Sequence, residues 1–299
     1  MSKDPVWLPR DQILSCEEVN RVASILASMG VEKIRLTGGE PLVRPGIEEI
    51  VNGLARTPGV QSVSMTTNGT LLAEKAWTLK RAGLKSVTIS LHSLKRERFS
   101  RITGGGEIED VLAGMRAAKE SGLTPLKVNS LIIRGYNDDE IIDLASLARN
   151  ASVAVRFIEY MPFDGQSQWS PATVVSGAEI VEKIKNHYDL IPLKREEGST
   201  VRRYRFADSK GEVDIITSMT QPFCLDCERV RLSADGKIVP CLFDKAECDL
   251  KPALRHGASN VLLSNLIRQA VFSKAPGVVA LLDKGGPVKH VRPMHTIGG

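Results

Sequence analysis

The chain has 299 residues, of which 42% are hydrophobic and 25% are charged. This composition is typical of a globular protein and argues against disordered, collagen-like and low-complexity classes. The net charge of +5 suits an anionic small molecule as well as a polynucleotide. Because no apolar run approaches the ~20 residues of a membrane span, and the first residues lack the apolar core of a signal peptide, we expect a cytoplasmic protein without membrane contact.

Strand-like runs alternate with helical patterns through the first half of the chain. The expected strands span 33–36, 62–67, 86–91, 126–133 and 154–160. The expected helices span 46–55, 71–82, 109–121 and 138–149. This alternation predicts βαβ units and hence a parallel sheet. After about residue 165 it gives way to a hairpin over 201–217 and a helix over 260–273. We therefore expect an α/β domain over 1–165 and a smaller metal-bearing region over 166–299.

Polar residues recur where the predicted strands end, and ligands of parallel sheets bind at those ends. The turn Gly38-Gly39-Glu40 either admits a ligand to the backbone, with Glu40 offered to an ammonium group, or is simply a tight turn. Arg35, Lys127 and Arg156 are cations within strands. Because burial of an unpaired charge is costly, they predict either an anionic ligand or core ion pairs.

The strongest chemical signal is Cys224-x2-Cys227-x13-Cys241. Three thiolates with an open fourth position suit an iron–sulfur cluster. A fourth ligand, Cys248, would instead complete a structural zinc tetrahedron, and the spacing alone leaves both readings open.

Two arginines follow the second cysteine of this motif. In an extended segment Arg229 and Arg231 point to the same side, where two guanidinium groups could grip a phosphate or a purine edge. The alternative is a solvated, charged strand.

Several motifs occur in one order along the chain. They are RLTGGEPL (35–42), TTNG (66–69), SL (90–91), KVN (127–129), RFIEYMP (156–162), FC-x2-C-x-RVRL (223–232) and GG (298–299). Together they closely resemble the GTP 3′,8-cyclase family, radical S-adenosylmethionine lyases of molybdenum-cofactor biosynthesis.

The resemblance implies a partial (βα)6 TIM-like barrel with two [4Fe–4S] clusters and S-adenosylmethionine. In the family, the N-terminal cluster cleaves S-adenosylmethionine to a radical that takes the 3′ hydrogen of GTP. The ribose radical then attacks purine C8, while the C-terminal cluster holds the guanine through its open iron. The implied product is (8S)-3′,8-cyclo-7,8-dihydroguanosine 5′-triphosphate, in the first step of the pathway. The resemblance also implies a homodimer and an electron donor, and no nucleic-acid partner.

The resemblance also assigns residues by position. The implied contacts to S-adenosylmethionine are Gly39, Ser90 and Met161. Those to GTP are Arg35, Thr66, Lys127, Arg229, Val230 and Arg231. The implied cluster ligands are Cys224, Cys227 and Cys241, which leaves Cys248 as a bystander. The implied tail that reaches into the active site is Gly298-Gly299.

The sequence departs from the family pattern near its start. The family begins with a strand and a Cys-x3-Cys-x2-Cys motif, whereas Cys16 is the only cysteine here before the Gly38-Gly39 turn. We therefore expect a barrel that lacks its first strand, with the first cluster present only in a longer form. The alternatives are a nucleotide-binding remnant without catalysis, another radical enzyme with an auxiliary cluster, or a zinc-knuckle module. A smaller departure is His92, where the family usually has Asp.

Overall fold

The computed structural model describes residues 8–151, 153–163, 169–243, 247–275 and 277–279. Its main feature is a curved sheet with strand order β1-β2-β3-β4-β5-β8-β7-β6. The strands are β1 (Lys33–Leu36), β2 (Ser62–Thr67), β3 (Ser86–Ser90), β4 (Lys127–Ile132), β5 (Ala154–Glu159), β6 (Leu190–Pro192), β7 (Arg202–Phe206) and β8 (Glu212–Ile216). Strands β1 to β5 and β8 run parallel, and β7 and β6 are antiparallel additions. This is the expected partial barrel.

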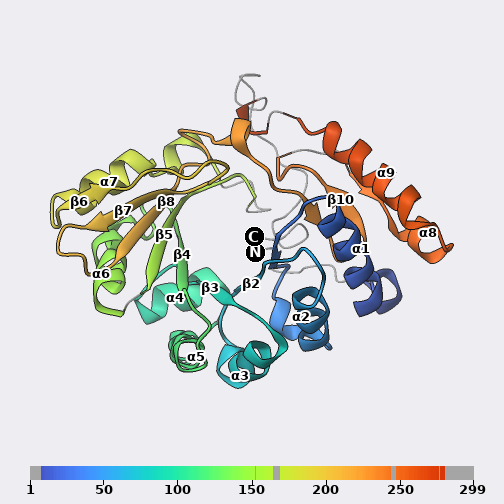
Figure 1. Cartoon of the computed structure of the whole chain (residues 1–299). Helices are drawn as coiled ribbons and strands as arrows, with labels where there is room; N and C mark the ends of the chain where they lie inside the picture. The colour runs from blue at the N-terminus through green and yellow to red at the C-terminus, as the bar shows by residue number, and fades with distance from the viewer. Residues whose placement is uncertain (1–7, 152, 164–168, 244–246, 276, 280–299) are drawn as a thin grey trace.

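Helices cover the outer face of the sheet, and the strands curve around the inner face (Figure 1). The covering helices are α2 (Ile47–Ala55), α3 (Leu72–Ala82), α4 (Arg96–Thr103), α5 (Ile108–Glu120), α6 (Ile141–Ala151) and α7 (Gly177–Lys185). Strands β2, β4 and β5 alternate buried with partly buried side chains. The buried row packs on the helices, so the other row, which includes Lys127 and Arg156, faces inward.

A second layer packs the first described helix against the end of the chain. It joins α1 (Cys16–Ser28), α8 (Lys251–Arg255), α9 (Asn260–Phe272) and a small sheet of β9 (Arg231–Leu232), β10 (Lys237–Val239) and β11 (Cys248–Asp249). Its core includes Val22, Ile238 and Ile267, all with no exposed surface. Figure 1 shows these helices side by side. This packing holds β9, the strand between Cys227 and Cys241, in place.

The predicted strands match the structure to within one residue at each end. Helix α6 begins at Ile141 rather than residue 138, because residues 138–140 form a 3-10 turn. Helices α4 and α7 were not expected. The predicted hairpin is β7–β8, and β8 pairs with β5, so residues beyond 165 extend the same sheet.

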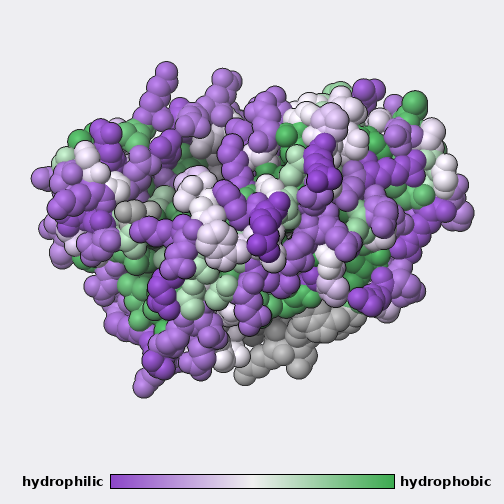
Figure 2. All heavy atoms as spheres, turned by 60° about the horizontal axis from the view of Figure 1, so that its bottom comes forward, coloured by the Kyte–Doolittle hydropathy of each residue, from purple (hydrophilic) through white to green (hydrophobic). Residues whose placement is uncertain are grey.

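The outer surface is dominated by polar side chains. Figure 2 shows a largely hydrophilic face with small, scattered hydrophobic areas. Among the helices of the described residues, none combines the length and the hydropathy needed to cross a membrane.

Candidate active site

The inner face carries polar side chains on neighbouring strands at matching heights. One row joins Thr66, Thr88 and Lys127 on β2, β3 and β4. Arg35 on β1 reaches toward it, with its Nη1 atom 3.4 Å from Thr66 Oγ1 and 3.2 Å from Thr88 Oγ1. The structure thus brings together three of the predicted GTP contacts, Arg35, Thr66 and Lys127.

The next row toward the carboxyl ends joins Ser90, Asn129, Arg156 and Asp214 on β3, β4, β5 and β8. Arg156 Nε donates to Asp214 Oδ2 at 2.9 Å, and both side chains are largely buried. The buried Oδ1 atom of Asn129 has no hydrogen-bond partner among the described residues. An unpaired buried acceptor is costly, so this atom marks a place for a ligand donor.

The basic side chains lie close enough to perturb one another. Burial first, and then the charge of Arg156, lowers the pKa of Lys127 to about 8, while Asp214 opposes this change. Burial also lowers the pKa of Arg35 to about 10, with further contributions from Arg156 and Arg229. Because Asp214 offsets only part of this charge, the inner face is electropositive and suits a polyanion.

The three predicted contacts to S-adenosylmethionine lie at carboxyl ends of strands. Ser90 ends β3, Gly39 lies in the turn after β1, and Met161 follows β5. Met161 packs against an apolar group that contains Leu242 and Phe243, so it also adjoins the segment after Cys241. Whether these residues contact S-adenosylmethionine stays a prediction.

The contacts of Glu40 favour the tight-turn reading of the Gly38-Gly39-Glu40 segment. Its Oε1 atom accepts from Leu42 N at 3.0 Å and from Thr67 Oγ1 at 2.7 Å, and its Oε2 atom accepts from Asn68 N at 2.7 Å. The carboxylate therefore ties the turn after β1 to the end of β2, instead of being held out to an ammonium group.

The three motif cysteines line one pocket. The other side chains and backbone around it belong to Ser218, Phe223, Arg229, Arg231, Leu242, Phe243, Lys274, Ala275 and Gly277. Arg229 and Arg231 both line this pocket, while Val230 packs against the second core. This is the alternation that an extended segment imposes.

Charges around the pocket act on its thiols. Burial works to raise the pKa of Cys227, but Arg229, whose Nε lies 3.4 Å from the sulfur, and Lys274 outweigh it and lower that pKa. Burial and the neighbouring Cys224 and Cys227 raise the pKa of Cys241. Three soft donors sharing one pocket with cations that balance thiolate charge fit an iron–sulfur cluster.

Cys248 lies apart from this pocket. It belongs to β11, pairs with Ile238 and packs on the second core, and it does not line the pocket of the other three cysteines. Its role as a bystander stays a prediction. Within the described residues, no three His, Cys, Asp or Glu side chains are arranged to hold a single metal ion.

Three positions remain: His92, the tail Gly298-Gly299, and two pocket residues that the sequence did not indicate. His92 accepts the backbone N–H of Leu131 on Nδ1 at 3.1 Å, and burial lowers its pKa to about 4, so it is a neutral structural residue. The predicted catalytic tail, Gly298-Gly299, lies outside the described residues. Lys274 and Gly277 at the pocket were not foreseen, because no local pattern distinguishes them.

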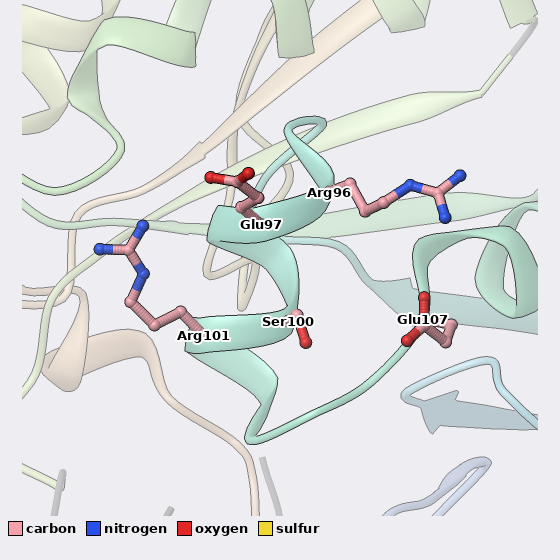
Figure 3. A pocket seen from close by; sticks show the side chains of 5 residues that line it. All are labelled: Arg96, Glu97, Ser100, Arg101 and Glu107. Atoms are coloured by element: carbon pink, nitrogen blue, oxygen red, sulfur yellow. The ribbon is translucent and has the colours of Figure 1, made fainter.

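A second pocket lies along α4 and shares no lining residue with the thiol pocket. Its lining is Arg96, Glu97, Ser100, Arg101 and Glu107. Figure 3 shows Arg96 and Arg101 extending in opposite directions from the helix. Arg96 is already paired with Glu109 at 2.5 Å. With mixed charges and no thiol in its lining, this pocket is not the better candidate.

Comparisons with known proteins agree with this geometry. The Radical SAM superfamily model matches residues 4–148, and the model named Molybdenum Cofactor Synthesis C matches residues 153–279. The barrel and its rim therefore define a radical S-adenosylmethionine protein.

Individual relatives narrow the class. The chain is 43% identical over 269 residues to a GTP 3′,8-cyclase of Pelotomaculum thermopropionicum, covering 89% of this chain and 83% of the relative. It is 42% identical over 293 residues to that of Thermodesulfovibrio yellowstonii, covering 98% and 89%. A crystal structure of methylornithine synthase aligns with 62% of this chain and 55% of its own, at 19% identity and a TM-score of 0.49. The chain belongs to the GTP 3′,8-cyclase family.

Proposed function

We propose that this protein is a GTP 3′,8-cyclase, which converts GTP to a 3′,8-cyclo-7,8-dihydroguanosine triphosphate at the start of molybdenum-cofactor biosynthesis. The observation that carries the proposal is the position of Arg229. This side chain is close enough to Arg35 to lower its pKa, and its Nε lies 3.4 Å from Cys227 Sγ. One guanidinium thus links the cationic inner face to the thiol pocket, as a ligand with phosphates at one end and a purine at the other requires.

The cations of the inner face serve the triphosphate in this proposal. Lys127 and Arg35 supply charge to phosphate oxygens, and Arg156 is held in place by its ion pair with Asp214. Thr66 orients Arg35 through its hydroxyl group. A planar guanidinium binds phosphate through two parallel hydrogen bonds, so the arginines orient the ligand as well as attract it.

The thiol pocket serves the guanine. Cys224, Cys227 and Cys241 would hold a [4Fe–4S] cluster, which would supply an open iron as a Lewis acid for the base. Arg229 and Arg231 flank the base and exclude water from that side of the pocket. Val230 belongs to the same strip through its backbone, because its side chain faces the second core.

The cofactor and the wider organisation complete the proposal. S-adenosylmethionine binds at the rim formed by Gly39, Ser90 and Met161, and a second cluster, which cleaves it, belongs to a form that carries the Cys-x3-Cys-x2-Cys motif. The tail Gly298-Gly299 acts at the reacting nucleotide. We further propose a barrel unit over 1–165, a substrate and cluster unit over 166–299, a cytoplasmic homodimer, and an external electron donor.

The first test measures binding without turnover. The anaerobically reconstituted chain should bind GTP, and replacing both Arg229 and Arg231 by Ala should abolish this binding. Iron content is measured in the same samples, because Arg229 also contacts Cys227, and the affinities are compared per iron-loaded chain. Equal GTP affinity in the wild-type and doubly substituted chains would reject the assignment of this pocket.

The second test measures turnover. A form that contains the Cys-x3-Cys-x2-Cys segment, supplied with GTP, S-adenosylmethionine and a reductant, should yield 5′-deoxyadenosine and the cyclised nucleotide. Absence of both products from a chain that carries its clusters would reject the cyclase assignment.

A further inference from the structure

The chain returns to the thiol pocket after α9. The ammonium group of Lys274 donates to the backbone carbonyl of Cys227, and to that of Arg229 at 3.0 Å. Lys274 also lines the pocket. One side chain therefore holds the backbone of both a predicted cluster ligand and a predicted substrate contact.

The segment between these two carbonyls lies outside the regular elements, and its other contacts are local: Cys227 N donates to Cys224 O at 3.3 Å, Arg229 lies over the Phe223 ring and Val230 packs on the second core. Residues 227–230 belong to no helix or strand, and β9 begins only at Arg231. Hydrogen bonds from an ammonium group to carbonyls are among the stronger ones in proteins. Lys274 is therefore a main restraint on this otherwise irregular stretch.

Gly277 closes the same wall of the pocket. An ideal Cβ at this position would lie 2.6 Å from Cys224 Sγ and 3.7 Å from Cys241 Sγ. Its φ of +74° also lies in the left-handed region that favours glycine. The neighbouring Val278 has no exposed surface and packs with Val174 and Met219, which anchors the wall to the barrel side.

We propose that Lys274 is a positioning residue that sets the arrangement of Cys227 and Arg229, and that Gly277 is required for the wall to approach the two sulfurs. The part of this proposal that concerns GTP rests on the proposed function. The part that concerns the thiol pocket does not, because it needs only the metal-binding capacity of the three cysteines.

The first experiment compares Lys274→Met with Lys251→Met in the anaerobically reconstituted chain. Lys251 is a matched control, since its ammonium also donates to a backbone carbonyl, that of Gln12 at 3.1 Å, but it does not line the pocket. We expect K274M to release iron to a chelator about tenfold faster and to bind GTP about tenfold more weakly. K251M should match the wild type in both measurements.

The possible results distinguish the proposed role of Lys274 from the proposed function of the protein. Equal iron-release rates for K274M and K251M would overturn the role of Lys274 at the pocket. If the wild-type chain retains iron but fails to bind GTP, the proposed function fails, while the iron-release comparison still decides the role of Lys274.

The second experiment guards against a K274M chain that does not fold. Gly277→Ala is compared with Gly257→Ala, because Gly257 has a φ of +75° but no atom within 4 Å of an added Cβ. Both variants carry the same backbone strain, and only G277A crowds a sulfur. We expect G277A to hold less iron per chain than G257A, and equal iron contents would overturn the requirement for glycine at this wall.

Discussion

The lowered pKa of Lys127 predicts that GTP binding depends on pH in a range where an ordinary lysine stays charged. A lysine carries its charge below its pKa, which is about 8 here and about 10.4 for an unperturbed side chain. If the ammonium group binds phosphate, affinity should be constant up to about pH 7 and should fall as the pH rises through 8.

The size of the effect follows from the same value. At pH 9, about a tenth of the chains carry a charged Lys127 before binding, since the pH is about one unit above the pKa. Affinity that requires this charge therefore falls about tenfold from its value at neutral pH, which corresponds to about 1.4 kcal/mol. A lysine with an ordinary pKa would give almost no change over this range.

The assay is equilibrium binding of GTP between pH 7 and pH 9 to the wild-type chain and to Lys127→Met. Ionisation of GTP itself affects both chains, so the ratio of their affinities isolates Lys127. We expect this ratio to fall about tenfold across the range. A constant ratio would refute the perturbed pKa, and a ratio near one at every pH would refute the contact with phosphate.

Three further predictions follow from the structure. Glu159→Gln should lower the free energy of unfolding in urea by about 2–4 kcal/mol, because a buried acceptor of backbone N–H groups is lost, whereas the exposed Glu109→Gln should change it little. Cys241→Ser should lose most of its iron on reconstitution, whereas Cys248→Ser should match the wild type. Arg156→Met should move the pH midpoint for GTP binding above 8, because Arg156 lowers the pKa of Lys127; an unchanged midpoint would contradict this coupling.

Much of the barrel could be predicted because its signals are local. The alternation of apolar with polar residues in β2 and β4 and the glycine after α3 mark boundaries within a few residues of sequence. Helix α4 escaped prediction because it is short and buries little besides Phe99. The rim was predictable in outline, since polar groups at strand ends share one edge of a parallel sheet.

The contacts that complete the pocket could not be predicted in this way. Lys274 lies 47 residues after Cys227 and follows an ordinary helix, so it reaches the pocket through the tertiary packing of α9 on α1 and on the small sheet of β10 and β11. Glu40 shows that even a local motif does not by itself reveal what its side chain contacts. Its place beside two glycines fits either a ligand contact or a tight turn, and only the three donors from nearby backbone and Thr67 show that its carboxylate braces the turn.

Unlike Asp214, which pairs with Arg156, three acidic side chains stabilise loops near the strand ends. Glu40, Glu140 and Glu159 each accept backbone N–H groups from a neighbouring loop near the carboxyl ends of the strands. Because these acids stabilise the loops, the basic side chains of the inner face are left to bind ligand rather than to pair with them. Lys127→Met should then weaken GTP binding with little loss of stability, and Glu159→Gln should do the reverse. If both variants lost stability equally, the cations would be part of the fold, and the electropositive inner face would no longer argue for a polyanionic substrate.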